Sequence, residues 1–287
     1  MRKLGLSERF ACKVAGQSRS VQRYTKQAKR KDDPDASLRA YLRTFAASHP
    51  RWGFRRAYAQ ARADGWHVNH KKIQRLWREE GLRVPVKRRK KRAGTSTADP
   101  ATLPQANAPN AVWAIDFQFD ATNDGKSIKI LSVIDEYTRE NLGGLVERSI
   151  DAKRLKGELE HISRLRGSYP LVLRMDNGPE MISNVLRDWA EGRLSTYYVP
   201  PGSPWKNGYI ESFNGKMRDE CLNLNYFWSL TQARVVIGDW REEYNHLRPH
   251  SALGYQTPAQ FACARPVAAV GTTSLPEQQA ILKDIDQ

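Results

Sequence analysis

The sequence has few cysteines and no paired cysteine motif. Its 287 residues include only Cys12, Cys221 and Cys263, which lie far apart, and no C-x-x-C pair occurs. This pattern argues against a disulfide framework and against a structural zinc site. The sequence therefore predicts a protein that folds around apolar cores in a reducing cytosol.

Long apolar runs are also missing. A membrane-spanning helix needs about 20 consecutive, mostly apolar residues, and no stretch approaches that length. The opening residues, MRKLGLSERFACKVAG, are interrupted by Glu8, Arg9 and Lys13, so they make a poor signal peptide. No internal repeat is evident. These features exclude membrane-spanning and repeat architectures and predict a cytoplasmic protein.

Acidic residues are scarce in one part of the chain only. Residues 1–92 contain 27 Lys and Arg against 7 Asp and Glu, a net charge of +20. Residues 93–287 contain 20 against 24, a net charge of −4. Such asymmetry predicts a polyanion-binding arm joined to a body of different purpose, and nucleic acid is the polyanion that Lys and Arg neutralise most often. The alternative is a solubilising basic tail.

Helical periodicity dominates residues 1–92. Segment 1–32 resembles a helix-turn-helix in size, with two short helices. Residues 36–92 are predicted to be a helix-turn-helix DNA-binding domain with a basic tail, its last helix capped by Asn69 and stopped by Gly81.

The last helix of that domain, residues 69–80, is basic on one side. A groove-reading helix needs such a face, and a small helical bundle with a solvated basic face is the alternative. We expect Arg75 to contact a base edge, because arginine can pair bidentately with guanine. The expected DNA-binding residues here are Lys71, Lys72, Arg75 and Arg78.

A Pro-, Ala- and Thr-rich linker at 93–109 separates this domain from a region with a different periodicity. Alternating and apolar runs predict an α/β fold over 110–265, with a mixed five-stranded sheet and helices on its faces, followed by a tail at 266–287. The expected strands are 112–122, 127–137, 139–146, 171–176 and 195–199, and the expected helices are 151–166, 180–191, 207–223 and 231–245.

Three carboxylates fall at notable places in this scheme. Asp116 lies in the centre of the first strand, Asp176 ends the fourth, and Glu211 follows the stiff loop PPGSPWKN, one turn into a helix. If the first and fourth strands are neighbours, the acids meet at one edge of the sheet. Mg²⁺ prefers such oxygen ligands, and two ions would stabilise both the attacking and the leaving oxygen at phosphorus.

Five ordered motifs carry a more specific signal. They are WAIDF at 113–117, VIDEYTRE at 133–140, RMDNGPE at 174–180, PGSPWKNGYIESFNGKMRDE at 201–220 and YNHLRPHSALGYQTP at 244–258. With the stretch at 51–82, they make the chain resemble the DDE transposases, which have a ribonuclease H-like, retroviral integrase-type core. Within that group it resembles the second-reading-frame (OrfB-type) products of bacterial insertion-sequence family three. The spacing from Asp176 to Glu211 is one residue shorter than the family pattern.

The resemblance implies a function. Asp116, Asp176 and Glu211 would be the catalytic residues and would hold two Mg²⁺ or Mn²⁺ ions. The chain would bind the terminal repeats of its element and target DNA, cut one strand and join the freed end to a new site. It would work as a homo-oligomer on DNA, in the bacterial cytoplasm near the nucleoid, and the upstream-frame product of the same element is a candidate partner.

The helix that carries Glu211 offers further candidates. Asn214 and Arg218 share its face by three- and four-residue spacing, and Lys206 lies in the loop before it. We expect Lys206, Asn214 and Arg218 to bind DNA. Trp205 either stacks on a base or packs, and Arg248 and His250 either contact DNA or pack.

Other acids and other functions compete with this interpretation. Asp120 shares a strand face with Asp116, Asp135 ends the second strand, and Glu180 begins a predicted helix; we expect none of them to be catalytic. The alternative functions are an inactive or domesticated DNA-binding regulator and a ribonuclease H-like nuclease without strand transfer.

Overall fold

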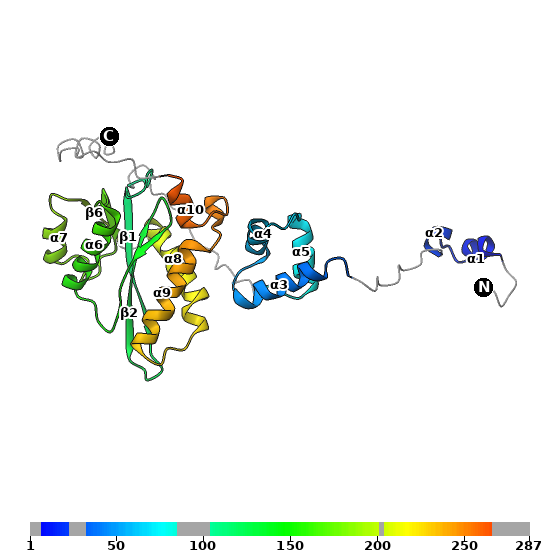
Figure 1. The fold of residues 1–287 in the computed structure, drawn as a ribbon, viewed down its shortest axis with the longest axis horizontal. Coiled ribbons are helices and arrows are strands. Elements are labelled where there is room, and N and C mark those ends of the chain that lie inside the picture. Colours follow the sequence, from blue (N-terminus) through cyan, green and yellow to red (C-terminus); the bar gives the residue numbers. More distant parts are fainter. Residues whose placement is uncertain (1–6, 23–32, 85–103, 201–203, 266–287) are drawn as a thin grey trace.

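The computed structural model describes residues 7–22, 33–84, 104–200 and 204–265 (Figure 1). The predicted basic tail at 86–92, most of the linker, the first residues of the loop before Glu211 and the tail at 266–287 lie outside this range. Two short helices, α1 (Glu8–Val14) and α2 (Arg19–Gln22), come first, and the Ser7 hydroxyl caps α1 by accepting from the Phe10 N–H.

Three helices form a small domain with its own core. They are α3 (Ala36–Ser48), α4 (Phe54–Ala63) and α5 (His70–Glu79). The Asn69 side chain accepts from the Lys71 N–H and so fixes the start of α5, as the sequence predicts. Apolar residues at helical spacing turn inward from all three helices, and the fully buried ones include Leu42, Ala57, Ala61, Ile73 and Leu76.

The second part of the chain is built on a mixed sheet in the order β3-β2-β1-β5-β6. A long antiparallel hairpin of β1 and β2 forms one half, and β5 and β6 run parallel to β1 on the other side. The predicted neighbourhood of the first and fourth strands is confirmed, because β1 pairs directly with β5. The strands are β1 (Val112–Ala121), β2 (Ser127–Asp135), β3 (Asn141–Gly143), β4 (Val146–Glu147), β5 (Val172–Met175) and β6 (Ser195–Tyr198).

The sheet has six strands rather than the five expected, because the predicted strand 139–146 is broken in two. Gly144 lies at the break with φ 138°, and a Cβ there would collide with the carbonyl oxygen of Leu131. Arg241 donates to the carbonyls of both Gly144 and Leu131, at 2.9 and 2.7 Å. The chain therefore leaves and rejoins the edge of β2 around a position that only glycine fits.

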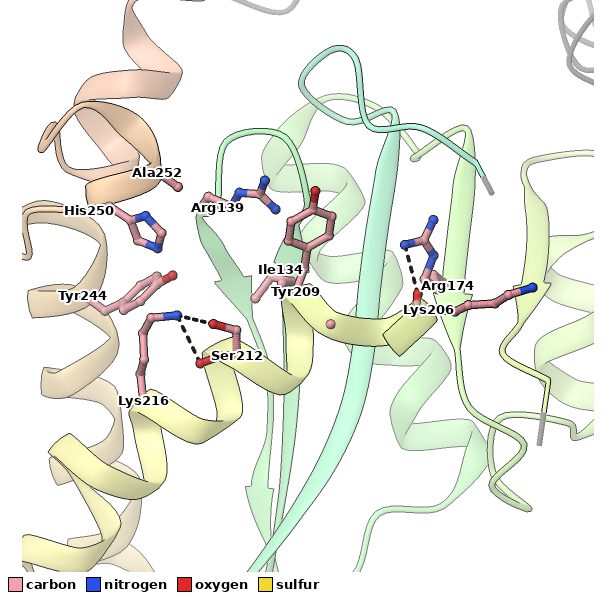
Figure 2. Close-up of a pocket in the computed structure, with 11 residues that line it drawn as sticks. Ile134, Arg139, Arg174, Lys206, Tyr209, Ser212, Lys216, Tyr244, His250 and Ala252 are labelled. Carbon is pink, nitrogen blue, oxygen red and sulfur yellow. Dashed lines mark hydrogen bonds between the residues drawn. The ribbon is translucent and has the colours of Figure 1, made fainter. Parts of the chain in front are cut away.

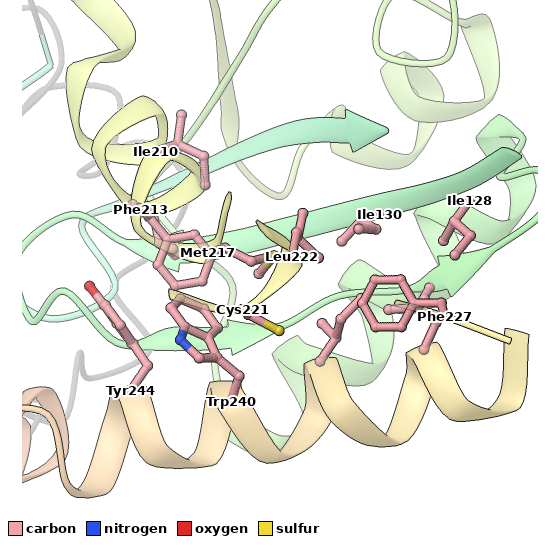
Figure 3. Close-up of a cluster of buried hydrophobic side chains, with 14 of the residues drawn as sticks. Ile128, Ile130, Ile210, Phe213, Met217, Cys221, Leu222, Phe227, Trp240 and Tyr244 are labelled. Atoms are coloured by element: carbon pink, nitrogen blue, oxygen red, sulfur yellow. The ribbon is translucent and has the colours of Figure 1, made fainter. Parts of the chain in front are cut away.

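Helices cover both faces of the sheet, which gives the three layers expected of an α/β fold (Figure 1). One face packs against α6 (Ala152–Arg166) and α7 (Asn184–Ala190), and the other against α8 (Gly208–Glu220) and α9 (Leu230–His246). Figure 3 shows the apolar residues of α8 meeting Trp240 and Tyr244 of α9. A short helix, α10 (Pro258–Cys263), follows with a capping box at Thr257.

The predicted helix 180–191 begins later than expected, at Asn184. The Ser183 side chain caps it by accepting from the Leu186 N–H. Glu180 lies in the preceding turn, where it forms an ion pair with Lys129 at 2.5 Å. The acid that the sequence placed at a helix start is therefore held by a lysine of β2 instead.

The small helical domain contacts the end of α8. Arg51 makes two hydrogen bonds to Asp219, at 3.0 and 2.8 Å, and the Trp52 indole donates to Glu220 at 3.2 Å. Arg56 of α4 donates to the Pro249 carbonyl at 3.3 Å. These polar contacts join the two parts of the chain.

Across the residues that the structure places, no helix has the length and hydropathy to cross a membrane.

Candidate active site

Strand register places Asp116 and Asp176 on neighbouring strands. In the parallel pair, Val112 faces Val172 and Ala114 faces Arg174, which is a constant offset of 60 residues. The same offset aligns Asp116 in β1 with Asp176, the first residue after β5. Residues level with each other on adjacent strands point to the same face, and the strands lie about 4.8 Å apart. The register therefore brings these two residues to the same edge of the sheet, where the charge of Asp176 acts on Asp116.

Helix α8 is fixed across the same face of β1 by polar contacts. The Asn214 amide donates to Asp116 at 2.8 Å, and the Gln118 amide donates to the Asn214 carbonyl at 2.8 Å. One turn further, Arg218 donates to Asp120 at 2.7 Å. Because Glu211 lies one turn before Asn214 on this helix face, it comes toward the edge where Asp116 and Asp176 lie.

The electrostatics of Asp116 show that negative charge gathers here. Burial, together with the charges of Asp176 and Glu211, raises the pKa of Asp116 to about 6. Hydrogen bonds from the Phe117 N–H and the Asn214 amide oppose the rise. A half-buried carboxylate beside two other carboxylates is a group that a cation would stabilise.

The donor set fits a hard divalent cation. All three side chains offer carboxylate oxygens, which Mg²⁺ and Mn²⁺ prefer, and the charges of Asp176 and Glu211 both act on the buried carboxyl of Asp116. Among the residues placed by the structure, however, no three acidic, histidine or cysteine side chains are gathered closely enough to hold an ion. Convergence of all three carboxylates on one site therefore stays a prediction.

The basic residues of α5 divide into two pairs. Lys72 and Arg75 both contact Asp35, at 2.5 and 3.1 Å, and Arg75 also pairs with Glu79 at 2.9 Å. Lys71 and Arg78 are exposed, and neither has an ion-pair partner in the described part of the chain. Arg75, expected to read a base, would have to leave two carboxylates to do so.

The three expected DNA-binding residues near Glu211 have different surroundings. Asn214 is only 5% exposed and its amide holds Asp116, so the structure gives it a partner inside the protein. Arg218 is tied to Asp120 at 2.7 Å with its side chain still partly exposed. Lys206 lines a cavity beside α8 (Figure 2).

The residues set aside as non-catalytic have structural partners. Asp135 is fully buried and accepts from the backbone N–H groups of Asn110, Tyr137 and Thr138, so it shapes the turn after β2. Arg248 is 2% exposed and makes a bidentate pair with Glu220, at 2.7 and 2.6 Å. Of the two alternatives for Arg248, packing describes its place in the structure.

Sequence reasoning missed Asn214 as the partner of Asp116. The signal was available, since Asn214 lies three residues after Glu211 and therefore on its helix face. What the sequence could not show is that this face lies against the part of β1 that carries Asp116 and Gln118.

Comparisons with known proteins agree with this architecture. The HTH-like domain family matches residues 33–90, and two integrase core domain families match residues 106–204 and 193–258. A 31.7 kDa protein of insertion element IS407 from Burkholderia multivorans is 43% identical, covering 91% of this chain and 92% of its own. A 39.2 kDa protein of insertion element IS476 from Xanthomonas euvesicatoria is 42% identical, covering 90% and 72%.

More distant matches extend the same picture. The Escherichia coli transposase InsD of insertion element IS2 is 27% identical, covering 80% of this chain and 79% of its own. Among solved structures, a chain of the simian T-cell lymphotropic virus intasome matches with a TM-score of 0.49 at 14% identity, covering 82% of this chain and 79% of that one. A structural match of that closeness carries no argument about activity.

Proposed function

This chain belongs to the OrfB-type transposases of bacterial insertion-sequence family three, and from that premise we propose that it binds the ends of its element and cuts and joins DNA there with Asp116, Asp176 and Glu211. The observation that carries the proposal is the parallel register of β1 and β5, which aligns Asp116 with Asp176, the first residue after β5, while α8 carries Glu211 over the same part of β1. The raised pKa of Asp116 is consistent with it: burial is the main cause, and the charges of Asp176 and Glu211 add to the rise.

Each residue of the site has a proposed role that follows from its position. Asp116 and Asp176 would hold two Mg²⁺ or Mn²⁺ ions from rigid strands, and Glu211 would complete the ligand set from the first turn of α8. Bound metal would polarise the phosphodiester and favour ionisation of the attacking water or hydroxyl. Asn214 keeps the Asp116 carboxylate in one orientation, which matches the role of hydrogen-bond partners around metal ligands.

The proposed reaction has two steps of the same type. In the first, water attacks a phosphodiester at the element end, a P–O bond to the 3′ oxygen breaks, and a 3′-hydroxyl is released. In the second, that hydroxyl attacks a phosphodiester of the target, a new P–O bond forms, and the target's own 3′-hydroxyl leaves. Bonds and charges balance in each step, so no covalent link to the protein is required.

DNA recognition is proposed for the helical domain. Lys71 and Arg78 point outward on α5 without a partner in the described chain, so they are the first candidates for phosphate contacts. Lys72 and Arg75 would join them by exchanging Asp35 for DNA, and near the carboxylates Arg218 is a further candidate. Assembly as a homo-oligomer on DNA, and a complex with the upstream-frame product, are proposed on family grounds alone.

A strand-transfer assay tests the proposal. Purified full-length chain is incubated with labelled duplex carrying an element end, unlabelled target duplex and Mg²⁺ or Mn²⁺. We expect nicked end and joined product, both abolished by EDTA. Nicking without joined product would favour the nuclease alternative, and unchanged DNA that is nevertheless bound would favour the regulator alternative.

A further inference from the structure

A cavity of about 490 Å³ lies beside the first half of α8 (Figure 2). Its walls come from β2 and the turn after it, from β5, from α8 and the turn before it, and from the end of α9 with the segment that follows. Four of the five motifs therefore meet there: 133–140, 174–180, 201–220 and 244–258. The lining residues that matter below are Arg139, Tyr209, Ser212, Lys216, Tyr244 and His250.

The geometry of α8 separates this cavity from the candidate active site. Successive helix residues point about 100° apart, so Glu211, Asn214 and Arg218 share one face. Ile210, Phe213 and Met217 share a second face, which is buried in the core (Figure 3). The third face, with Tyr209, Ser212 and Lys216, lines the cavity. The cavity and the carboxylates thus use different sides of one helix.

Positive charge around the cavity exceeds its internal compensation. Arg139, Lys216, Arg248 and Arg56 of the helical domain lie close enough to influence one another electrostatically. Glu220 offsets part of this charge, and Glu136 also attracts Arg139. Glu220 is already used by the bidentate pair with Arg248. Arg174 and Glu136, at the other end of the cavity, form a matched buried pair.

Neither Lys216 nor Arg139 forms an ion pair with a carboxylate among the described residues. The Lys216 ammonium donates to the hydroxyl and carbonyl of Ser212, at 2.6 and 3.1 Å (Figure 2). Arg139 stacks on the Tyr209 ring, with its guanidinium carbon 3.6 Å from the ring centre. Burial together with the neighbouring cations lowers the pKa of Lys216 to about 8. Unpaired, half-buried cations of this kind are destabilised until an anion joins them.

Several buried polar atoms at this place also lack a hydrogen-bond partner among the described residues. They are the His250 Nδ1, one terminal nitrogen of Arg139 and one of Arg248. His250 is 91% buried and lines the cavity. Arg139 holds its position with φ 64°, a backbone conformation that costs energy for a residue with a side chain. The two arginine nitrogens are buried donors without partners, and such donors mark a place where a ligand can supply acceptors.

We propose that this cavity binds a backbone phosphate of DNA, with Lys216 and Arg139 as its principal contacts. That the phosphate belongs to DNA rests on the function proposed above. That the site binds a phosphate rests on the charges and unpartnered donors of the cavity. A phosphodiester supplies the negative charge and the acceptor oxygens that the cavity lacks. Tyr209, 46% exposed, holds the Arg139 guanidinium against its ring and so positions one of the two contacts. The motif YNHLRPHSALGYQTP thereby gains a role, since Tyr244 and His250 belong to it.

Equilibrium binding in EDTA tests the proposal without any chemistry at the carboxylates. The full chain and its Lys216→Gln, Lys216→Arg and Lys153→Gln variants are titrated against fluorescein-labelled duplex across a salt series. Lys153 is exposed on α6, in the opposite helical layer, and its replacement makes the same charge change. We expect Lys216→Gln to weaken binding roughly three- to tenfold at low salt and to reduce the slope of log K against log salt by about 0.9, the value for one lost phosphate contact. Lys216→Arg should restore both, and Lys153→Gln should change neither.

Melting curves show whether Lys216 acts through structure or through the anion. Without phosphate, Lys216→Gln should melt no lower than the wild type, because it removes an uncompensated charge; a lower melting temperature would indicate a structural role and overturn the proposal. Inorganic phosphate should raise the melting temperature of the wild type more than that of Lys216→Gln. If phosphate stabilises the wild type more than Lys216→Gln, but the two proteins bind DNA with the same affinity and salt slope, the cavity binds free phosphate rather than DNA. Because no cleavage is measured, these results do not depend on whether the carboxylates catalyse strand transfer.

Discussion

Two sides of α8, one with Glu211 and one with Lys216, carry opposite charges. On one side, Glu211 approaches Asp116 and Asp176, and the pKa of Asp116 rises because of burial and these neighbours. On the other side, Lys216 lies with Arg139 and Arg248, and its pKa falls for the matching reasons. A ligand of the opposite sign would stabilise each cluster, and the proposals above assign a divalent cation to one and a phosphate to the other. If both hold, α8 carries the metal site on one side and a DNA phosphate site on another.

The largest effect should come from the carboxylate side. Asp116→Asn, Asp176→Asn and Glu211→Gln should each reduce cleavage and joining by more than about a hundredfold, because losing a ligand costs more than losing a partner that orients one. DNA affinity in EDTA should stay within about twofold, since no phosphate contact is removed. Gel-based strand transfer and anisotropy measure the two effects.

Matched controls for these exchanges lie on exposed parts of the other helical layer. Asp188→Asn on α7 and Glu160→Gln on α6 make the same chemical change away from the site. Both should keep wild-type activity. Full activity in any one of the three site variants would remove that residue from the proposed ligand set.

The next effect concerns Asn214, which connects the helix to the carboxylate side. Asn214→Ala should lower the cleavage rate by about 10- to 100-fold, as is typical when the partner of a metal ligand is lost. Because its amide also opposes the rise in the pKa of Asp116, the variant should need more Mg²⁺ for half-maximal rate. Cleavage measured over a Mg²⁺ titration checks this. A lower rate with an unchanged Mg²⁺ requirement would mean that Asn214 does not act through Asp116.

The cations around the cavity should make the stability of the protein depend on pH, through His250. Burial, aided by the cations around it, lowers the pKa of His250 from 6.5 to about 3. Between these values the unfolded chain binds a proton that the folded chain does not, so stability falls as the pH drops from 6.5 toward 3. The effect should be about 3 kcal/mol by pH 4.

His250→Asn is the variant that isolates this term. Urea unfolding of wild type and variant from pH 7 to pH 4 should show a shallower loss of stability in the variant. Parallel pH dependences would mean that His250 is protonated equally in both states and that the cavity is less cationic than inferred.

The smallest expected effect comes from Arg139→Asn, because asparagine tolerates the left-handed backbone that Arg139 adopts. DNA affinity should fall about threefold, by loss of one partly solvated charge contact. The Mg²⁺ requirement of cleavage should not change, because Arg139 faces the cavity rather than the carboxylates. Anisotropy and a Mg²⁺ titration on the same samples give both numbers. An altered Mg²⁺ requirement in Arg139→Asn would show that the cavity and the carboxylates do not act independently.

Much of the candidate site could be predicted from local sequence. An aspartate in the middle of an alternating strand, another at the end of an apolar strand and a glutamate after a proline-rich loop define the positions of Asp116, Asp176 and Glu211. The pairing of β1 with β5 follows from the usual topology of such sheets. Which amide would hold Asp116 did not follow, because it depends on how α8 is turned about its axis against β1.

The cavity could not be predicted for a related reason. Its cations come from the turn after β2, from α8, from the segment after α9 and from the helical domain, and nothing in the sequence relates them. The sequence left Arg248 and His250 open between packing and DNA contact, and the structure separates them, with Arg248 in a buried pair and His250 at the cavity. The break at Gly144 was missed because it is caused by a close approach to β2, a contact between segments.

Helix α8 leaves natural variation little freedom. A surface helix usually tolerates substitutions on its solvent side, and that tolerance lets sequences drift between relatives. Here one side faces the carboxylates, one is buried against Trp240 and Tyr244, one lines the cavity, and the end is held by Arg51 and Trp52. Exposed Gly215, which has nothing within 4 Å of where a Cβ would stand, is a position left open to change. A saturation library across 208–220, selected for transposition, should therefore be depleted at nearly every position and permissive at 215.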